Sequence, residues 1–253
     1  MMSFPSKQML IDALDGMFWA HDDEKFDLPR IDGPKKASMI YRKNIVEITW
    51  NSLASFERNP TTLPQTATIL RGQSVGGVSI GDLLQVKNYG DAGKLLVDLV
   101  VAGDFGLNSE TSCRLHQLAG KEDALEWGVF RYLKVGIYDV EYTPPDPEVL
   151  PDLARRGFAF LNESIEDPCE RAVAAFLFMS RSQFFFDANK RTASLIMNGV
   201  LMSNGYFPMT VLNKESEEFH KQLGRFYETG DATPMMRFFR RMAAELYQGR
   251  SAR

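Results

Sequence analysis

The sequence predicts a mostly α-helical protein with one small β element. Three observations support this: apolar residues recur at helical spacing along most of the chain, start and stop signals bound several of these stretches, and strand-like alternation occurs in one short segment, residues 129–142. At 253 residues the chain is long enough to bury a sizeable core.

Helical patterns account for most of the first half of the chain. Residues 1–36 are expected to be irregular or to hold a short helix. The apolar spacing from Met39 to Leu53 predicts a helix over about 37–58, which Asn59-Pro60 ends because the residue before proline is pushed out of the α region. Three further helices are expected, one beginning at Thr62, one running from Ser79 to about Val101, and one running from Asn108 or Ser109 to Leu118.

The predicted β element lies at residues 129–142, where Leu133, Val135 and Ile137 alternate with more polar or smaller residues. This alternation is typical of a strand or a hairpin, and the proline-rich run after Thr143 is expected to be an extended linker. More helices are expected after it, from about Val149 to Asn162, from Asp167-Pro168, from about Asn189 to Asn204-Gly205, and as a pair within 214–247 broken at Gly230-Asp231.

Composition excludes several classes of protein. The chain has 29 Lys plus Arg against 33 Asp plus Glu, so its net charge of -4 lacks the broad basic surface expected of a nucleic-acid binder. Cys113 and Cys169 are the two cysteines, and the absence of a CxxC pair argues against a disulfide framework or a zinc site. No apolar run reaches membrane-spanning length and the first residues lack a signal-peptide core, so we expect a cytoplasmic protein that binds no membrane.

The stretch from Gln183 to Ser194 is the part of the sequence most suggestive of chemistry. An acid, an amide and two cations lie within Asp187 to Arg191, between two segments that are apolar nearly all round and are expected to be buried helices. If the second helix begins at Asn189, its first N–H groups lack helical partners and its dipole adds partial positive charge.

These features predict an anion hole suited to phosphate. Ala188 would let the backbone approach a ligand closely, and Lys190 and Arg191 add formal charge. Asp187 would hold a magnesium ion that shares oxygens with the phosphate. A second interpretation stays open, in which Asp187 and Asn189 only cap a helix and the two cations face solvent.

Histidine is scarce in the chain, which has His21, His116 and His220. None of them lies near Gln183 in sequence, so proton transfer by histidine at this stretch would require the fold to bring one there. His116, on an apolar helical pattern, is expected to be a satisfied core residue rather than a ligand.

The segment Asp187-Ala-Asn-Lys-Arg-Thr-Ala resembles the core motif of the Fic/Doc (Fido) family. That motif runs His-x-Phe-x-Asp/Glu-Gly/Ala-Asn-Gly/Lys-Arg-x-x-Arg, and the chain matches it at Phe185 and from Asp187 to Arg191. It departs at Gln183, where the family has histidine, and at Ser194, where the family has its final arginine. The Ala-Asn-Lys-Arg variant is most similar to the Doc branch, whose motif also lacks the final arginine.

The resemblance extends over roughly residues 37–245 and implies a mostly α-helical Fido fold with a small β-hairpin flap. Glu57-Arg-Asn-Pro-Thr-Thr-Leu-Pro is similar to the segment that carries the inhibitory glutamate in regulated Fic proteins. Trp127 to Arg131 and the predicted hairpin look like the flap region. The implied organisation is an N-terminal helical extension over 1–66 with an inhibitory-helix-like segment, followed by a Fic/Doc-like core domain over 67–253.

The resemblance also implies roles for individual residues. Fic proteins usually transfer AMP from ATP to a hydroxyl of a target protein, and Doc proteins transfer the terminal phosphate. With ATP and magnesium as cofactors, Asp187 would bind the metal, Asn189 would position the α-phosphate or the loop backbone, and Arg191 would hold phosphate oxygens. Lys190 and Ala188 would complete the phosphate site, although the direction of the Lys190 side chain stays open.

Gln183 would occupy the position of the motif histidine, the general base. An amide does not titrate near neutral pH, and general-base catalysis contributes about 10² to 10⁴-fold, so slow or absent transfer is expected. Glu57 would be the regulatory glutamate, but its usual arginine partner is Ser194, so pairing with Arg191 is the alternative hypothesis.

Three functions follow from the resemblance. The first is a Fic-fold pseudoenzyme that binds ATP and magnesium but transfers AMP weakly or not at all. The second is an active adenylyltransferase or kinase that modifies a target-protein hydroxyl. The third is a protein-interaction or regulatory module. The flap near Lys134 to Glu141 would bind the target peptide as an added strand, and the sequence identifies neither the target protein nor an oligomeric state.

Overall fold

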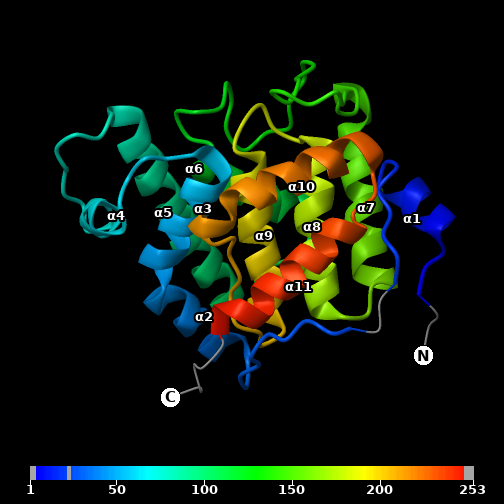
Figure 1. The fold of residues 1–253 in the computed structure, drawn as a ribbon, viewed down its shortest axis with the longest axis horizontal. Coiled ribbons are helices and arrows are strands. Elements are labelled where there is room, and N and C mark those ends of the chain that lie inside the picture. The colour runs from blue at the N-terminus through cyan, green and yellow to red at the C-terminus, as the bar shows by residue number, and fades with distance from the viewer. Residues whose placement is uncertain (1–3, 22–23, 248–253) are drawn as a thin grey trace.

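The structure is a computed structural model that describes residues 4–21 and 24–247. It is mostly helical, as predicted (Figure 1). Its α-helices are α1 (Lys7–Ala13), α2 (Pro34–Lys43), α3 (Ile45–Glu57), α4 (Leu63–Leu70), α5 (Ile80–Ala102), α6 (Ser109–Ala119), α7 (Leu150–Ser164), α8 (Pro168–Ser182), α9 (Asn189–Ser203), α10 (Ser216–Thr229) and α11 (Thr233–Tyr247). Two short 3-10 turns, η1 (Pro147–Val149) and η2 (Asn213–Glu215), precede α7 and α10.

Most helix boundaries follow local signals that the sequence carries. Thr62 and Gln65 form a capping box at the start of α4, and the Asp167 side chain accepts the N–H of Glu170 at 2.8 Å at the start of α8. The single helix predicted over 37–58 is instead two helices. The chain breaks at Asn44, whose side-chain amide donates to the Ile40 carbonyl at 2.8 Å and competes with the helical pattern.

Helices α8 and α9 lie side by side at the centre of the molecule and are joined by the loop 183–188 (Figure 1). Helix α9 contacts α5 and α6, whereas α8 contacts α7 and α11, so both central helices are covered by neighbours. The α7–α8 contact is close, because a Cβ placed on Gly157 would lie 2.3 Å from the Phe178 ring. The loop between α8 and α9 is therefore carried by two helices that are fixed on all sides.

The predicted break at Gly230-Asp231 is also where the N-terminal segment attaches. Gly230 ends α10 with a φ of 72°, and a Cβ there would lie 2.3 Å from the Gly16 carbonyl oxygen. The Phe18 N–H donates to the Gly230 carbonyl, and the Ala232 N–H donates to the Phe18 carbonyl. Glycine is therefore required at this position both for its backbone conformation and for the close approach of the segment.

One buried core runs through the described residues, and α3 packs against α5 and α9. The division of the chain after residue 66 stays a prediction. Within residues 4–21 and 24–247, no helix is both long and apolar enough to cross a bilayer.

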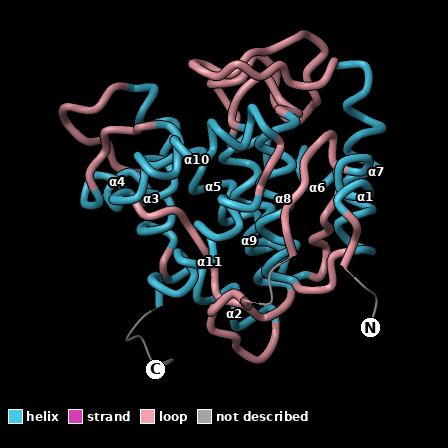
Figure 2. Tube along the Cα trace, turned by 45° about the vertical axis from the view of Figure 1, so that its right-hand side comes forward, coloured by secondary structure: helices cyan, strands magenta, loops and turns pink. Residues whose placement is uncertain are grey.

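The β hairpin predicted for residues 129–142 does not form. The described part of the chain contains no strand, and its isolated β-bridges are Phe18–Asp231 and Arg30–Tyr206 (Figure 2). A lone two-stranded hairpin is marginal in water without a sheet or helix to support it. Here the Arg131 guanidinium instead donates hydrogen bonds to the Leu133 and Pro145 carbonyls, and these bonds hold the segment as an irregular loop.

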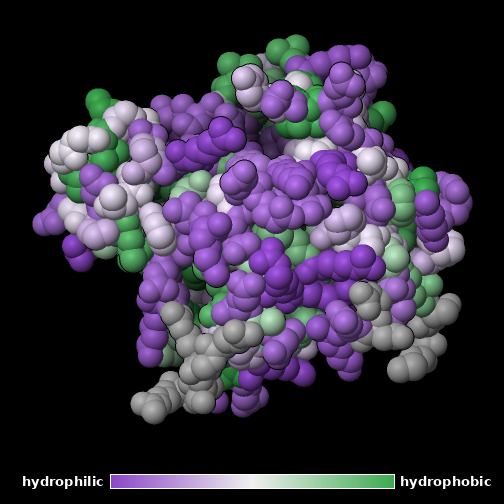
Figure 3. Space-filling view, in the orientation of Figure 1, coloured by the Kyte–Doolittle hydropathy of each residue, from purple (hydrophilic) through white to green (hydrophobic). Residues whose placement is uncertain are grey.

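This loop carries much of the exposed apolar surface. Figure 3 shows hydrophobic residues gathered at the top of the molecule, where the loop lies. The exposed large apolar side chains there are Leu125, Trp127, Val129, Tyr132, Leu133 and Tyr138. We name residues 125–141 the flap loop.

Candidate functional site

A cavity of about 840 Å³ opens beside the loop between α8 and α9. Its wall comes from the end of α3, residues 136–140 of the flap loop, the loop 183–190 and one face of α10. The predicted site residues that line it are Glu57, Gln183, Asp187, Asn189 and Lys190. The fold therefore brings Glu57, the predicted regulatory residue, to the same cavity as the motif residues 183–190, and we name it the motif cavity.

The loop that enters the motif cavity has an unusual backbone. Gln183 and Ala188 adopt left-handed conformations with φ of 48° and 55°, which non-glycine residues rarely do. Ala188 precedes α9, which begins at Asn189 as predicted, and the first helical bond runs from the Thr192 N–H to the Ala188 carbonyl. The N–H groups of residues 189–191 are therefore left without helical partners at the positive end of the helix dipole.

Asn189 fixes the shape of this loop. Its Oδ1 accepts the Phe185 N–H at 2.9 Å, and its Nδ2 donates to the Phe185 carbonyl at 2.8 Å and to Gln183 Oε1 at 2.9 Å. Of the two roles that the resemblance implies for Asn189, these bonds match the one of holding the loop backbone.

Gln183 is built into the same network. Its Nε2 donates to the Ser180 carbonyl at 2.6 Å, and its own backbone carbonyl accepts Arg131 Nε at 2.6 Å. Since Gln183 Oε1 also accepts from Asn189, both the nitrogen and the oxygen of the side-chain amide have partners in the protein. Because an amide does not titrate near neutral pH, this side chain orients the loop and offers no proton acceptor of useful strength.

Arg191 is buried behind the cavity among three carboxylates. Its guanidinium lies 3.3 Å from Glu57, 2.5 Å from Asp123 and 3.3 Å from Asp187, and it also donates to the Ala119 carbonyl at 2.9 Å. Burial alone would lower the pKa of Arg191, but the carboxylates, Glu57 foremost, outweigh it and raise the pKa.

The pairing of Glu57 with Arg191, which was the alternative hypothesis from sequence, is present in the structure. Arg191 does not line the motif cavity. Its donors are directed at the Ala119 carbonyl and the three carboxylates, so contact between Arg191 and phosphate would require a carboxylate to leave.

Asp187 is the residue that fits a magnesium ion. Its side chain is 53% exposed, and its Oδ1 accepts the Ala188 N–H and Arg191 Nη2. Within the described residues no group of three or more His, Cys, Asp or Glu is suited to a metal. Magnesium commonly takes one or two carboxylates plus substrate phosphates, so Asp187 fits an ion that arrives with a polyphosphate.

Ser194, at the position of the family's final arginine, is completely buried on α9. Its hydroxyl lies 3.4 Å from the Tyr89 hydroxyl of α5. It therefore serves the packing between α5 and α9 and does not reach Glu57.

The fold also brings residues to the site that the sequence did not identify as functional. Asp123, in the turn after α6, makes the shortest ion pair with Arg191. No local pattern marks it, because its partner lies on a distant helix. His116 is buried and satisfied as predicted, but one of its partners is the Asp187 carbonyl, at 3.1 Å from its Nε2.

His220 lines the motif cavity although it is distant from Gln183 in sequence. Its Nε2 is buried and has no hydrogen-bond partner within the described residues. Burial, followed by the charge of Lys190, lowers its pKa, while a hydrogen bond with the Ser55 backbone works in the opposite direction. The ring is therefore neutral near pH 7, with a nitrogen available to accept a proton.

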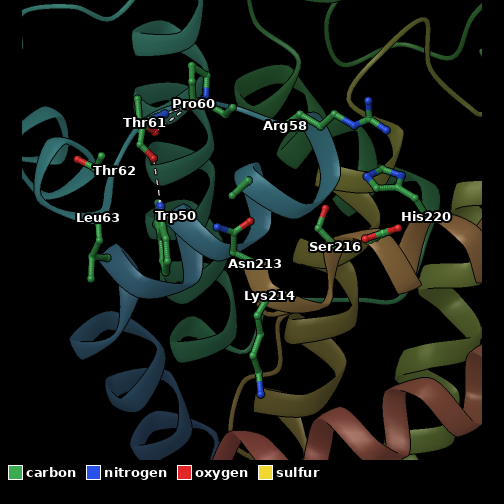
Figure 4. Close-up of a pocket in the computed structure, with 13 residues that line it drawn as sticks. Trp50, Arg58, Pro60, Thr61, Thr62, Leu63, Asn213, Lys214, Ser216 and His220 are labelled. Atoms are coloured by element: carbon green, nitrogen blue, oxygen red, sulfur yellow. Dashed lines mark hydrogen bonds between the residues drawn. The ribbon is translucent and has the colours of Figure 1, made fainter.

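A second cavity of about 870 Å³ lies on the other side of the end of α3, and Arg58 and His220 line both cavities. Figure 4 shows this α3 cavity, with Trp50 bonded to the Thr61 carbonyl and Lys214 pointing away from the other labelled side chains. Lys214 instead pairs with Glu215 and Glu245.

Comparison with known proteins finds one family for part of this chain. Residues 106–201, which include α6 to most of α9, match the model of the Fic/DOC family. The protein adenylyltransferase Fic of Drosophila grimshawi is 27% identical over 187 residues, which cover 72% of this chain and 38% of that protein. The chain thus spans less than half the length of this relative.

Solved structures share the fold. Fic-1 from C. elegans superposes with a TM-score of 0.73 at 22% identity, covering 85% of this chain and 68% of that one. IbpAFic2 in complex with adenylylated Cdc42 superposes with a TM-score of 0.55 at 18% identity, covering 87% and 66%.

The family match includes the loop 183–190 and residues 136–140 of the cavity wall, whereas α3 and α10 lie outside it. The adenylyltransferase relative and the shared fold agree with this match. Together these comparisons support a Fic/Fido family protein.

Proposed function

We propose that this chain is a divergent Fic protein that binds ATP with magnesium in the motif cavity and transfers AMP slowly or not at all. The observation that carries the proposal is Gln183, an amide with both ends engaged in hydrogen bonds, at the position of the family's general base. Around it the phosphate-binding features of the loop are retained.

Four features support nucleotide binding. The N–H groups at the start of α9 are free of helical partners, and the cavity beside them has room for a nucleotide. Lys190 lines the cavity and adds formal positive charge. Asp187 would hold the magnesium ion, which neutralises charge on the phosphates.

Weak transfer follows from the same geometry. A target hydroxyl needs a partner that takes its proton as the new bond to phosphorus forms. Gln183 offers only an amide oxygen, which already accepts from Asn189. Loss of a general base costs about 10² to 10⁴-fold in rate.

Glu57 would act as a regulatory residue by holding Arg191 away from the phosphates. Its side chain is only 16% exposed and lies 3.3 Å from the Arg191 guanidinium. In this scheme residues 1–66 form an extension that supplies the glutamate, and residues 67–253 form the core that binds the nucleotide.

A second candidate function is an active adenylyltransferase or kinase that modifies a protein hydroxyl. His220 favours it, because its Nε2, which has no hydrogen-bond partner in the part of the chain that the structure describes, belongs to a neutral imidazole on the wall of the same cavity. In this candidate His220, rather than Gln183, would take the proton.

The third candidate is a protein-interaction module, with a partner bound at the flap loop. The exposed apolar side chains of that loop, including Trp127, Leu133 and Tyr138, favour a protein partner. The fold neighbour IbpAFic2 is solved with adenylylated Cdc42, which supports a protein as the partner class.

ATP labelled separately at the α and the γ phosphate separates these candidates. The wild type and Asp187→Ala are incubated with each label, magnesium and cell lysate. We expect little transfer of either label and a clear ATP-induced rise in melting temperature, because a ligand that binds only the folded state stabilises it. Robust labelling by the wild type that Asp187→Ala abolishes would rule out the weak-transfer proposal, and the label would distinguish AMP from phosphate transfer.

A further inference from the structure

We propose that His116 is a positioning residue, which joins residues 183–188 (named here the phosphate loop) to Gly128 of the flap loop and thereby sets where Asp187 presents its carboxylate. The proposal rests on the function proposed above for the effect on nucleotide binding. The geometry that carries it is independent of any ligand.

His116 bridges two segments that enclose the motif cavity. Its Nε2 lies 3.1 Å from the Asp187 carbonyl, and its Nδ1 accepts the Gly128 N–H at 3.0 Å. The side chain is completely buried on α6. A single imidazole thus connects the residue that would hold magnesium to the flap loop.

The tautomer follows from these partners. A backbone N–H can only donate, so Nδ1 of His116 must be the unprotonated acceptor for Gly128. The proton of the neutral ring is then on Nε2, which donates to the Asp187 carbonyl. Both nitrogens are used in one orientation, and turning the ring over would break both bonds.

Packing fixes the ring in that orientation. It stacks on Phe185 of the motif with ring centroids 3.8 Å apart and an angle of 6° between the planes. On another side, a Cβ placed on Gly120 would lie 2.4 Å from His116 Nε2. Glycine at position 120 therefore leaves the space that the histidine occupies.

A second link runs parallel to the first. The Arg131 N–H donates to the Phe184 carbonyl at 2.9 Å, and its Nε donates to the Gln183 carbonyl at 2.6 Å. Arg131 thus holds the start of the phosphate loop, and His116 holds its end at Asp187. Without His116, Asp187 would be restrained on one side only, by its contacts with Ala188 and Arg191.

Three substitutions separate positioning from packing. His116→Gln keeps an amide that can donate to the Asp187 carbonyl, His116→Asn keeps an acceptor near Gly128, and His116→Phe keeps the flat ring against Phe185. Phe239→Leu, in the core of α11, is the control for a general loss of stability. Melting temperature, the dissociation constant of Mg·ATP by calorimetry, and amide hydrogen exchange of residues 184–190 without ligand are measured for each.

Positioning predicts that His116→Gln binds Mg·ATP within about threefold of the wild type, whereas His116→Phe and His116→Asn bind about tenfold more weakly. Positioning also predicts that the amides of residues 184–190 exchange faster in His116→Phe and His116→Asn than in His116→Gln. If His116 serves packing alone, His116→Phe, which keeps the ring shape, should be the variant nearest to the wild type in melting temperature, Mg·ATP binding and amide exchange. A Phe variant equal to the wild type, or effects that follow melting temperature as in Phe239→Leu, would overturn the proposal.

The ligand-free measurements keep the proposal separate from the proposed function. If the wild type binds no nucleotide, the proposed function fails, while the order of amide exchange among the three variants still decides the role of His116. Nitrogen NMR of the His116 ring adds an independent check, since the structure requires the proton on Nε2. A proton on Nδ1 would contradict the arrangement.

Discussion

The motif cavity and the α3 cavity have nearly equal volumes, about 840 Å³ and 870 Å³, and share Arg58 and His220 on the wall between them. They differ in whether the polar and charged groups of their walls are already paired with other groups of the protein. The motif cavity receives free helix N–H groups, an exposed carboxylate at Asp187 and the cation of Lys190. In the α3 cavity, Trp50 is bonded to the Thr61 carbonyl and Lys214 is paired with Glu215 and Glu245.

The comparison shows that volume alone does not identify a binding site. Polar groups without partners are costly in a folded protein unless a ligand satisfies them, so their presence is the stronger indication. The predictions at Asp187 and Lys190 therefore each compare a residue of the motif cavity with a similar residue of the α3 cavity.

The largest effect is expected at the buried cation behind the motif cavity. Arg191→Met removes the buried guanidinium that pairs with Glu57, Asp123 and Asp187 and leaves these partly exposed carboxylates close together without a cation, so the free energy of unfolding should fall by about 3 kcal/mol. Arg58→Met, at the shared and exposed wall, should stay within about 0.5 kcal/mol of the wild type. Urea denaturation measures both, and equal effects would show that the carboxylate cluster contributes nothing.

The next effect concerns Asp187, the proposed magnesium ligand. Asp187→Ala should weaken Mg·ATP binding by about a hundredfold, because the one exposed carboxylate of the loop is lost. Glu217→Ala removes a carboxylate of the α3 cavity and should leave binding unchanged. Calorimetry with both variants tests this, and equal loss in the two would move the nucleotide site away from the loop.

A smaller effect is expected from the lysine of the loop. Lys190→Ala should weaken ATP binding by about tenfold, the size expected of one charge-assisted hydrogen bond. Lys214→Ala, the matched lysine of the α3 cavity, should weaken it by less than about twofold, because its charge is already paired. If Lys214→Ala weakens ATP binding more than Lys190→Ala does, ATP binds in the α3 cavity and not in the motif cavity.

The smallest effect is a dependence of stability on pH at the shared wall. The pKa of His220 is lowered from 6.5 by burial, Lys190 and Arg58, with Glu57 and the Ser55 backbone opposing them. As pH falls below about 6.5, His220 is protonated in the unfolded chain before it is protonated in the folded one. The free energy of unfolding of the wild type therefore decreases as pH falls from about 6.5 to the lowered pKa of the folded state. His220→Gln should lose less stability between pH 7.5 and 5.5 in urea denaturation, and an equal loss would contradict the lowered pKa.

Local signals explain how much of the fold could be predicted. Caps such as Thr62 and Asp167 and the break at Gly230 act within a few residues, so most helix positions could be predicted from the sequence alone. The break at Asn44 between α2 and α3 could not. The flap hairpin could not, because alternation at 129–142 indicates a strand only if a neighbour is available to pair with it. The Arg131 side chain instead donates to the Leu133 carbonyl within this segment and to the Pro145 carbonyl just after it.

The site divides in the same way. Asp187, Asn189 and Lys190 lie within one short motif, so their grouping in the cavity follows from their spacing. Asp123 and His220 come from other elements, and only the packing of α6 and α10 around the loop brings them to it. The contact between His116 and the Asp187 carbonyl is equally non-local, which is why a buried histidine could be predicted but its partner could not.

The effect of Gln183→His on the transfer rate tests the central claim most directly. Transfer of α-labelled phosphate from ATP to protein is compared between Glu57→Ala and the double variant Glu57→Ala/Gln183→His, so that the glutamate on Arg191 does not mask the chemistry. The account predicts that the histidine raises the rate by at least about a hundredfold, because it restores a general base at the loop. Equal and rapid transfer by both variants would contradict it, because it would mean that another residue already supplies the base.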